Sequence, residues 1–270
     1  MPFRSLWNNP RTLAGLTAAL VIGGALAPDS QSNGPVLQAA AAFVSADVAD
    51  SSAGEVSGRV AVETQRAVRA LRATVRELSH PKALETAFGS YFAFKSEHPS
   101  DVRKPLLYFV DYGLPNTTPR GYVFDMERLA IVEGPFTVAH GRGSSTSRTG
   151  VPTRFSNARG SNASSLGLYV AQSSYTFVGR AAGGVYRSIG LRLSGLSGSF
   201  NSNARARGVV AHGAPYVVAT RAGMSEGCPA MEQARAKRLL PKLANGGMVF
   251  LFAPKDEWLK RDPWIAASDN

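Results

Sequence analysis

The sequence predicts a mostly β domain with a few helices, the α+β class, preceded by a short helical segment. Three observations support this. From Pro105 onward, short runs rich in Val, Tyr, Phe, Leu and Ile, such as LLYFVDY and GMVFLFAP, alternate with clusters of Gly, Pro, Asn and Ser. No regular helical pattern separates these runs, which disfavours a doubly wound parallel sheet. Residues 59–98 instead carry apolar side chains at helical spacing.

The first 27 residues have the features of an export segment. Arg4 and Arg11 precede an uncharged stretch, residues 13–27, which is short for a membrane span but fits the apolar region of a signal peptide. We therefore expect residues 1–27 to be a signal peptide or membrane anchor, and the protein to be exported to the periplasm or cell envelope. A buried N-terminal helix is the alternative. The small, polar residues 28–58 predict a flexible linker.

Two helices are expected next, as a lead-in over residues 59–98. An amphipathic helix is predicted at 60–79, with one apolar face and arginines on the other. Pro81 is suited to the first position of a second helix, which extends to about Ser96. The β-rich domain then spans 105–255 and a tail follows at 256–270. Within that domain, one late helix is predicted at 229–243, directly after Cys228.

Composition limits the function classes. Cys228 is the only cysteine of the 270 residues, so an intramolecular disulfide is excluded. The formal net charge of +11 suits an anionic partner, such as lipid headgroups or cell-wall polymer. Nucleic acid is disfavoured because the sequence has no RNP pattern, zinc-finger spacing or basic run interleaved with aromatics.

Cys228 has the setting of a nucleophile. A helix starting at Pro229 would place the cysteine at the N-cap, where unpaired N–H groups and the helix dipole favour a thiolate. Glu226 and Glu232 oppose that effect through their negative charge. Structural cysteines usually lie within apolar runs, and this one does not.

A partner base is expected among the histidines. His140 and His212 each end a β run and precede a glycine, so each can project from a strand end toward a site. The alternative is a strand histidine that is bonded to a neighbouring carbonyl. His80 and His98 lie in predicted loops and are expected on the surface.

Two segments together resemble a known family. VVAHGAPYV followed by MSEGCPAM resembles the active-site signature of the murein L,D-transpeptidase catalytic domain, the YkuD-like family, in its branch with Cys-Pro-Ala after S-x-G. Upstream, FTVAHGRGSS and RFSNARGSNASSLGLYVAQ resemble the preceding segments of that branch. The resemblance covers roughly residues 106–253.

The resemblance implies a β-sandwich or barrel domain that carries a cysteine acyl-transferase. Cys228 matches the nucleophile and His212 the general base, while Ser225 and Gly227 match the loop whose backbone amides form the oxyanion hole. The implied reaction attacks the third-residue carbonyl of a peptidoglycan stem peptide and passes the acyl group to an amine or to water, with no metal or organic cofactor. Residues expected to contact the substrate are His140, Arg142, Gly213 and Tyr216.

The chain departs from the common family pattern after the serine and after the cysteine. Glu226 stands where the widespread form has a histidine, so the loop supplies no second base. Pro229 and Ala230 replace an apolar residue followed by Arg or Asn. The acceptor therefore stays open, and an L,D-carboxypeptidase or a non-catalytic basic wall-binding module are the alternatives.

Other readings of the same residues are weaker. Residues 223–227 fit the G-x-S-x-G elbow of α/β-hydrolases, but no histidine follows Ser225 as that fold requires. A zinc peptidase needs close-spaced ligands, which are absent unless His140 and His212 meet in space. The serine- and glycine-rich residues 141–165 are either a solvated loop or a border of the substrate groove, with these arginines: Arg142, Arg148, Arg154 and Arg159.

Overall fold

The computed structural model describes residues 36–181 and 183–269, with side chains for residues 54–181 and 183–268. The signal peptide or anchor expected at 1–27 lies outside these residues. Helix α1 spans Val36–Leu71, so it begins inside the segment expected as a linker. It ends earlier than the predicted residue 79, in the 3-10 turn η1, Arg72–Thr74. None of the described helices is long and apolar enough to cross a membrane.

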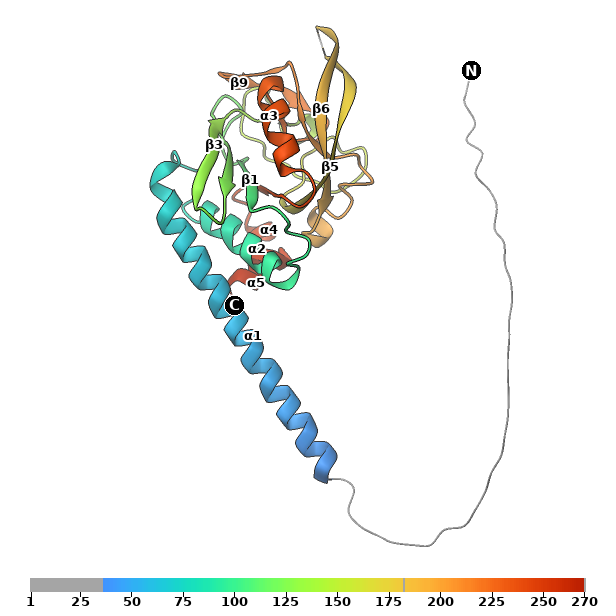
Figure 1. Ribbon diagram of the computed structural model, residues 1–270. Coiled ribbons are helices and arrows are strands. Elements are labelled where there is room, and N and C mark those ends of the chain that lie inside the picture. The colour runs from blue at the N-terminus through green and yellow to red at the C-terminus, as the bar shows by residue number, and fades with distance from the viewer. Residues whose placement is uncertain (1–35, 182, 270) are drawn as a thin grey trace, which may run out of the picture. The chain divides into compact units, whose positions relative to one another are not determined.

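The second predicted helix is present as α2, Ala83–Glu97. It packs into the same core as the strands, through Phe88, Tyr91 and their neighbours. The C-terminal tail also joins this core, since α4 (Asp256–Arg261) and α5 (Pro263–Asp269) bury Trp258 and Ile265. Figure 1 shows α2, α4 and α5 grouped together. The lead-in and the tail therefore belong to the compact unit that holds the β domain, Asp47–Asn270.

A mixed eight-stranded sheet forms the centre of this unit, in the order β11-β7-β6-β5-β12-β1-β2-β3. Pairs β1–β12 and β11–β7 are parallel and the others antiparallel. The α+β class is confirmed. The strands are β1 Leu106–Asp111, β2 Gly121–Asp125, β3 Ala130–Phe136, β5 Gly167–Ala181, β6 Gly184–Gly195, β7 Val210–Gly213, β11 Ala230–Met231 and β12 Met248–Phe252.

Two short ribbons complete the β structure. β4 (His140–Gly141) pairs with β10 (Met224–Ser225) in parallel, and β8 (Val217–Val218) pairs with β9 (Arg221–Ala222). The long hairpin β5–β6 projects from the sheet beside α3, Gln233–Leu243 (Figure 1). Short 3-10 turns follow β4, as η2 Arg142–Ser144, and β6, as η3 Gly198–Phe200.

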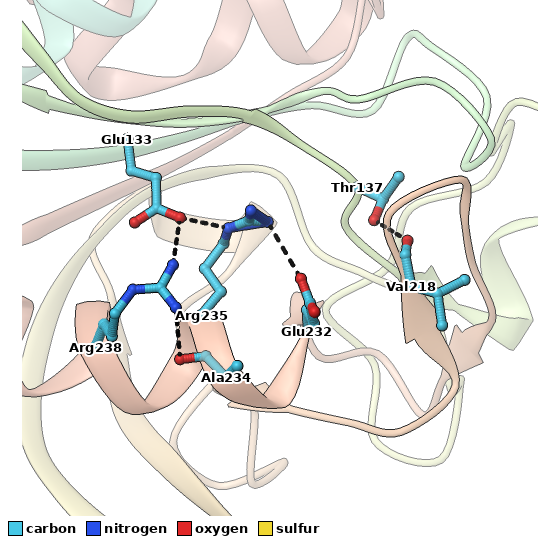
Figure 2. A network of polar contacts seen from close by, with 7 residues as sticks. All are labelled: Glu133, Thr137, Val218, Glu232, Ala234, Arg235 and Arg238. Atoms are coloured by element: carbon cyan, nitrogen blue, oxygen red, sulfur yellow. Dashed lines mark hydrogen bonds and ion pairs between the residues drawn. The ribbon is translucent and has the colours of Figure 1, made fainter.

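An ion-pair cluster attaches the start of α3 to the sheet edge (Figure 2). Glu133 Oε1 on β3 accepts from Arg235 Nε at 2.8 Å and from Arg238 Nη2 at 2.9 Å. The Arg235 guanidinium also lies 4.5 Å from the centre of the Phe136 ring. Nearby, Thr137 Oγ1 donates to Val218 O at 2.6 Å and fixes the β8–β9 ribbon to β3. The chain on the C-terminal side of Cys228 is therefore firmly anchored.

Candidate active site

Cys228 lies in a loop, residues 226–229, between β10 and β11. β10 pairs with β4, where Met224 lies opposite His140, and β11 pairs with β7, where Ala230 lies opposite His212. The two His-Gly strand ends noted in the sequence thus flank the cysteine loop, one on each side. Because parallel partners run in the same direction, both histidines lie at the level of this loop.

The prediction that a helix starts directly after Cys228 is wrong. α3 begins at Gln233 with Glu232 as its N-cap, since Ala230 and Met231 are paired with β7 instead. Cys228 therefore has no helix N-terminus to stabilise its thiolate. Burial raises the pKa of the Cys228 thiol, and the Val210 N–H and then the positive charge of Arg207 oppose that rise. The residue as a whole is partly exposed.

His212 is placed next to the cysteine by the backbone. Its N–H donates to Pro229 O at 3.2 Å, and the N–H of Val210, two residues earlier, donates to Cys228 Sγ at 3.5 Å. The Nδ1 of His212 lies 3.1 Å from Gly213 O, which assigns the proton to Nδ1 and leaves Nε2 as the acceptor. Burial lowers the pKa of His212, so the ring is neutral at pH 7.

An aromatic wall surrounds His212. The Phe177 ring meets the imidazole edge-to-face with centroids 5.6 Å apart, and Tyr216 does so at 6.5 Å. Tyr216 is partly buried, and burial first, then the charges of its neighbours, raises its pKa, so the hydroxyl stays protonated. Gly213 is buried against α3, where an added Cβ would come within 2.9 Å of Ala236 Cβ. This glycine supports the histidine and is not exposed to a substrate.

Ser225 and Gly227 shape the cysteine loop. Ser225 Oγ donates to Cys228 O at 2.6 Å and accepts from the Gly227 N–H at 3.2 Å. Gly227 has φ +117°, and a Cβ there would lie 2.9 Å from Ala163 O. The Gly227 N–H is thus engaged within the loop, whereas the Cys228 N–H makes no hydrogen bond to the backbone of the described residues.

His140 is completely buried, which leaves no surface for the expected substrate contact. Its Nδ1 accepts from Arg120 Nη2 at 2.9 Å, and the buried Arg120 also donates to Val138 O and Leu114 O. Burial, followed by the charge of Arg120, lowers the pKa of His140 to about 3. His140 is therefore a neutral structural residue beneath the site.

We predict that His140 makes the fold sensitive to acid. The unfolded chain binds a proton at His140 below its ordinary pKa of ~6.5, while the folded state does not until about pH 3, so stability falls as the pH falls through that window. In His140→Asn the side-chain oxygen can still accept from Arg120 but cannot titrate. Between pH 7 and pH 5, the free energy of unfolding measured in urea should fall by about 2 kcal/mol more in the wild type than in this variant. Equal losses would contradict the assignment.

Arg142, which is expected to contact the substrate, forms an ion pair with the cysteine loop. Its Nη2 lies 3.1 Å from Glu226 Oε1, and both side chains are more than half exposed. Glu226 raises the pKa of Cys228 as expected from its charge, and Arg142 partly neutralises it. No cluster of three possible metal ligands occurs among the described residues.

Two residues near the site were not predicted from the sequence. Ser164 is fully buried and connects both sides of the loop, since its Oγ accepts from the Gly141 N–H at 3.0 Å and donates to Gly227 O at 3.2 Å. It belongs to the serine-rich residues 141–165, in which the prediction singled out the arginines instead. The available signal was the run of small residues, which permits close backbone approach. Arg207 was also missed.

A cavity of about 770 Å³ lies between the β5–β6 hairpin and α3, and neither Cys228 nor His212 lines it. Phe177 is the residue that it shares with the wall around His212.

Comparison with known families agrees with this geometry. A model of the L,D-transpeptidase catalytic domain matches residues 76–252, well over half of the chain. The chain belongs to this family. The match also covers part of the helical lead-in, which is consistent with the shared core described above.

Solved L,D-transpeptidases are similar to the chain at low identity. One from Mycobacterium smegmatis is 14% identical, with a TM-score of 0.34, and the match covers 55% of this chain and 59% of that one. L,D-transpeptidase 3 from Mycobacterium tuberculosis is 14% identical, with a TM-score of 0.29 and coverage of 55% and 61%. The chain therefore spans about three-fifths of these structures. No curated protein matches it.

Within the L,D-transpeptidase domain, the small residue at position 230 has a structural reason. Pro229 O accepts the His212 N–H, and Ala230 O accepts the Ala139 N–H at 2.8 Å. Ala230 is completely buried in a small cluster that includes Ala139 and Ala214. A larger side chain at this position would have to displace β4 or β7.

Proposed function

We propose that the protein is a cysteine L,D-transpeptidase that acts on peptidoglycan stem peptides. Membership of the catalytic-domain family is the observation that carries this proposal. The local geometry supports it, because Cys228 is a partly exposed residue whose sulfur lies beside the strand that carries a neutral histidine of defined tautomer.

In the first half-reaction, His212 Nε2 takes the proton from the Cys228 thiol. The sulfur attacks the carbonyl carbon of the third residue, and an S–C bond forms. The protonated imidazole then returns the proton to the nitrogen of the terminal D-alanine, the C–N bond breaks and D-alanine leaves. The Cys228 N–H is the candidate donor to the oxyanion, because it has no backbone partner in the described part.

In the second half-reaction, His212 takes a proton from the acceptor. An amine from another stem gives a cross-link, and water gives a shortened peptide. The C–S bond breaks as the acceptor adds, and the thiolate recovers the proton from His212. The same residues serve both outcomes, so the acceptor decides between a transpeptidase and a carboxypeptidase.

This substrate requires a place outside the cytoplasm, and we propose export through residues 1–27. The net charge of +11 fits an anionic envelope. N-terminal sequencing of the mature protein tests the proposal, which predicts a start after the apolar stretch.

Product analysis tests the function. The purified chain is incubated with a disaccharide tetrapeptide, and the products are identified by mass spectrometry. Dimers that have lost one D-alanine support transpeptidation, and tripeptides support hydrolysis. Unchanged tetrapeptide, with folded protein and a reactive thiol, would favour a non-catalytic wall-binding module.

A further inference from the structure

Arg207 is a half-buried cation without a carboxylate partner. No Asp or Glu of the described residues lies within ion-pair distance of it. The loop 156–165 holds it instead: Nη1 donates to Ser156 O at 2.7 Å and to Ser165 Oγ, and Nη2 donates to Ser161 Oγ at 3.2 Å and to Ala163 O at 2.6 Å. Because all four terminal N–H groups are engaged, the guanidinium is held in place.

Holding a partly desolvated charge among neutral acceptors is costly unless an anion lies nearby. The described surroundings contain one group that becomes an anion on reaction, the Cys228 thiol. Arg207 is directed toward its loop, since Nη2 would lie 3.4 Å from a Cβ built on Gly227, the residue before the cysteine.

The residues that follow Arg207 also lie against the sulfur. Val210 N–H donates to Sγ at 3.5 Å, and the Cys228 thiol donates to Gly208 O at 3.9 Å. The same chain segment then continues to His212. Residues 207–210 therefore place a cation and an N–H donor beside one thiol.

We infer that Arg207 is a positioning residue that stabilises the Cys228 thiolate through its charge, together with the Val210 N–H. The inference rests on the proposed nucleophilic role of Cys228. The sequence suggested that a helix N-terminus stabilises the thiolate. The inference places that stabilisation in the turn before β7.

Burial raises the pKa of Cys228, and the Val210 N–H and then the charge of Arg207 oppose that rise. Burial lowers the pKa of Arg207, and Tyr169 and then a charged Cys228 oppose that fall. The opposing anion is Glu226, whose own partner is Arg142. The remaining ionisable groups around the sulfur are His212, Tyr112, Tyr175, Tyr186 and Tyr216.

The test is the pH profile of thiol alkylation by iodoacetamide, a neutral reagent, in the full chain. Arg207→Gln removes the charge, Arg207→Lys keeps it without the forked hydrogen bonds, and Arg205→Gln removes an exposed arginine of the same turn. We expect Arg207→Gln to move the midpoint to higher pH and to slow alkylation at pH 7 roughly tenfold. The lysine variant should recover most of that rate, and Arg205→Gln should match the wild type.

An unchanged midpoint in Arg207→Gln, with thermal unfolding showing a folded protein, would overturn the inference. So would equal midpoint shifts in the glutamine and lysine variants, because Arg207 would then act only by fastening the loop. The assay uses no peptidoglycan. The alkylation midpoint could depend on the charge at position 207 while the tetrapeptide stays unchanged in the product assay. That combination would support the inference and reject the proposed function.

Discussion

His212→Gln is expected to slow acyl-enzyme formation by about 10²–10⁴-fold at pH 7, the usual contribution of a general base. Glutamine can still donate to Gly213 O and fill much of the space beside Phe177, but it cannot accept the thiol proton. The measurement is the rate at which intact protein gains the acyl mass from a tetrapeptide. His98→Gln, at an exposed position far along the chain, is the matched control and should keep the wild-type rate.

The pH dependence of this rate gives a second check on the same residue. Burial lowers the pKa of His212, so its neutral form persists below the ordinary histidine value of ~6.5. The acid limb of kcat/KM should therefore fall below pH 6.5 in the wild type and be lost in His212→Gln. A wild-type rate in the variant would remove His212 from the mechanism.

Gly227→Ala is expected to reduce kcat/KM by about 10²-fold or more, because it displaces the nucleophile. At φ +117° an L-residue is strained, by about 1–3 kcal/mol, and its Cβ would lie 2.9 Å from Ala163 O, a backbone atom that cannot move freely. The loop must shift, and Ser225 then loses its bonds to Gly227 and Cys228.

Gly160→Ala is the matched control for this change. Gly160 also has a positive φ, +73°, but nothing lies within 4 Å of an added Cβ. It therefore carries the backbone strain without the collision. Thermal unfolding and the acylation rate should both be measured. Similar losses of activity in the two variants would contradict the proposed role of the close packing at Gly227.

The sequence predicted the parts of this protein that depend on local pattern. Apolar runs located the strands, and the His-Gly and Ser-x-Gly-Cys segments located the family and the loop. In the structure both His-Gly strand ends flank the cysteine loop, and His140 is completely buried.

The errors arose where tertiary pairing overrode a local signal. Pro229 is a good first residue for a helix, but Ala230 and Met231 form backbone pairs with β7 instead. α3 therefore starts later, at Gln233. His140 and His212 have the same local sequence and different environments. Arg120, 20 residues away in the sequence, donates a hydrogen bond to His140. Ser164 and Arg207 act through bonds to distant loops, which no periodicity reveals.

The central claim is that Cys228 carries the acyl group. The most direct measurement is the intact mass of the protein after incubation with a disaccharide tetrapeptide, in the wild type and in Cys228→Ala. We expect the wild type to gain the mass of the tetrapeptide less D-alanine, with the adduct located at residue 228 after proteolysis, and the variant to gain nothing. An adduct that persists in Cys228→Ala, or one that maps to another residue, would contradict the account.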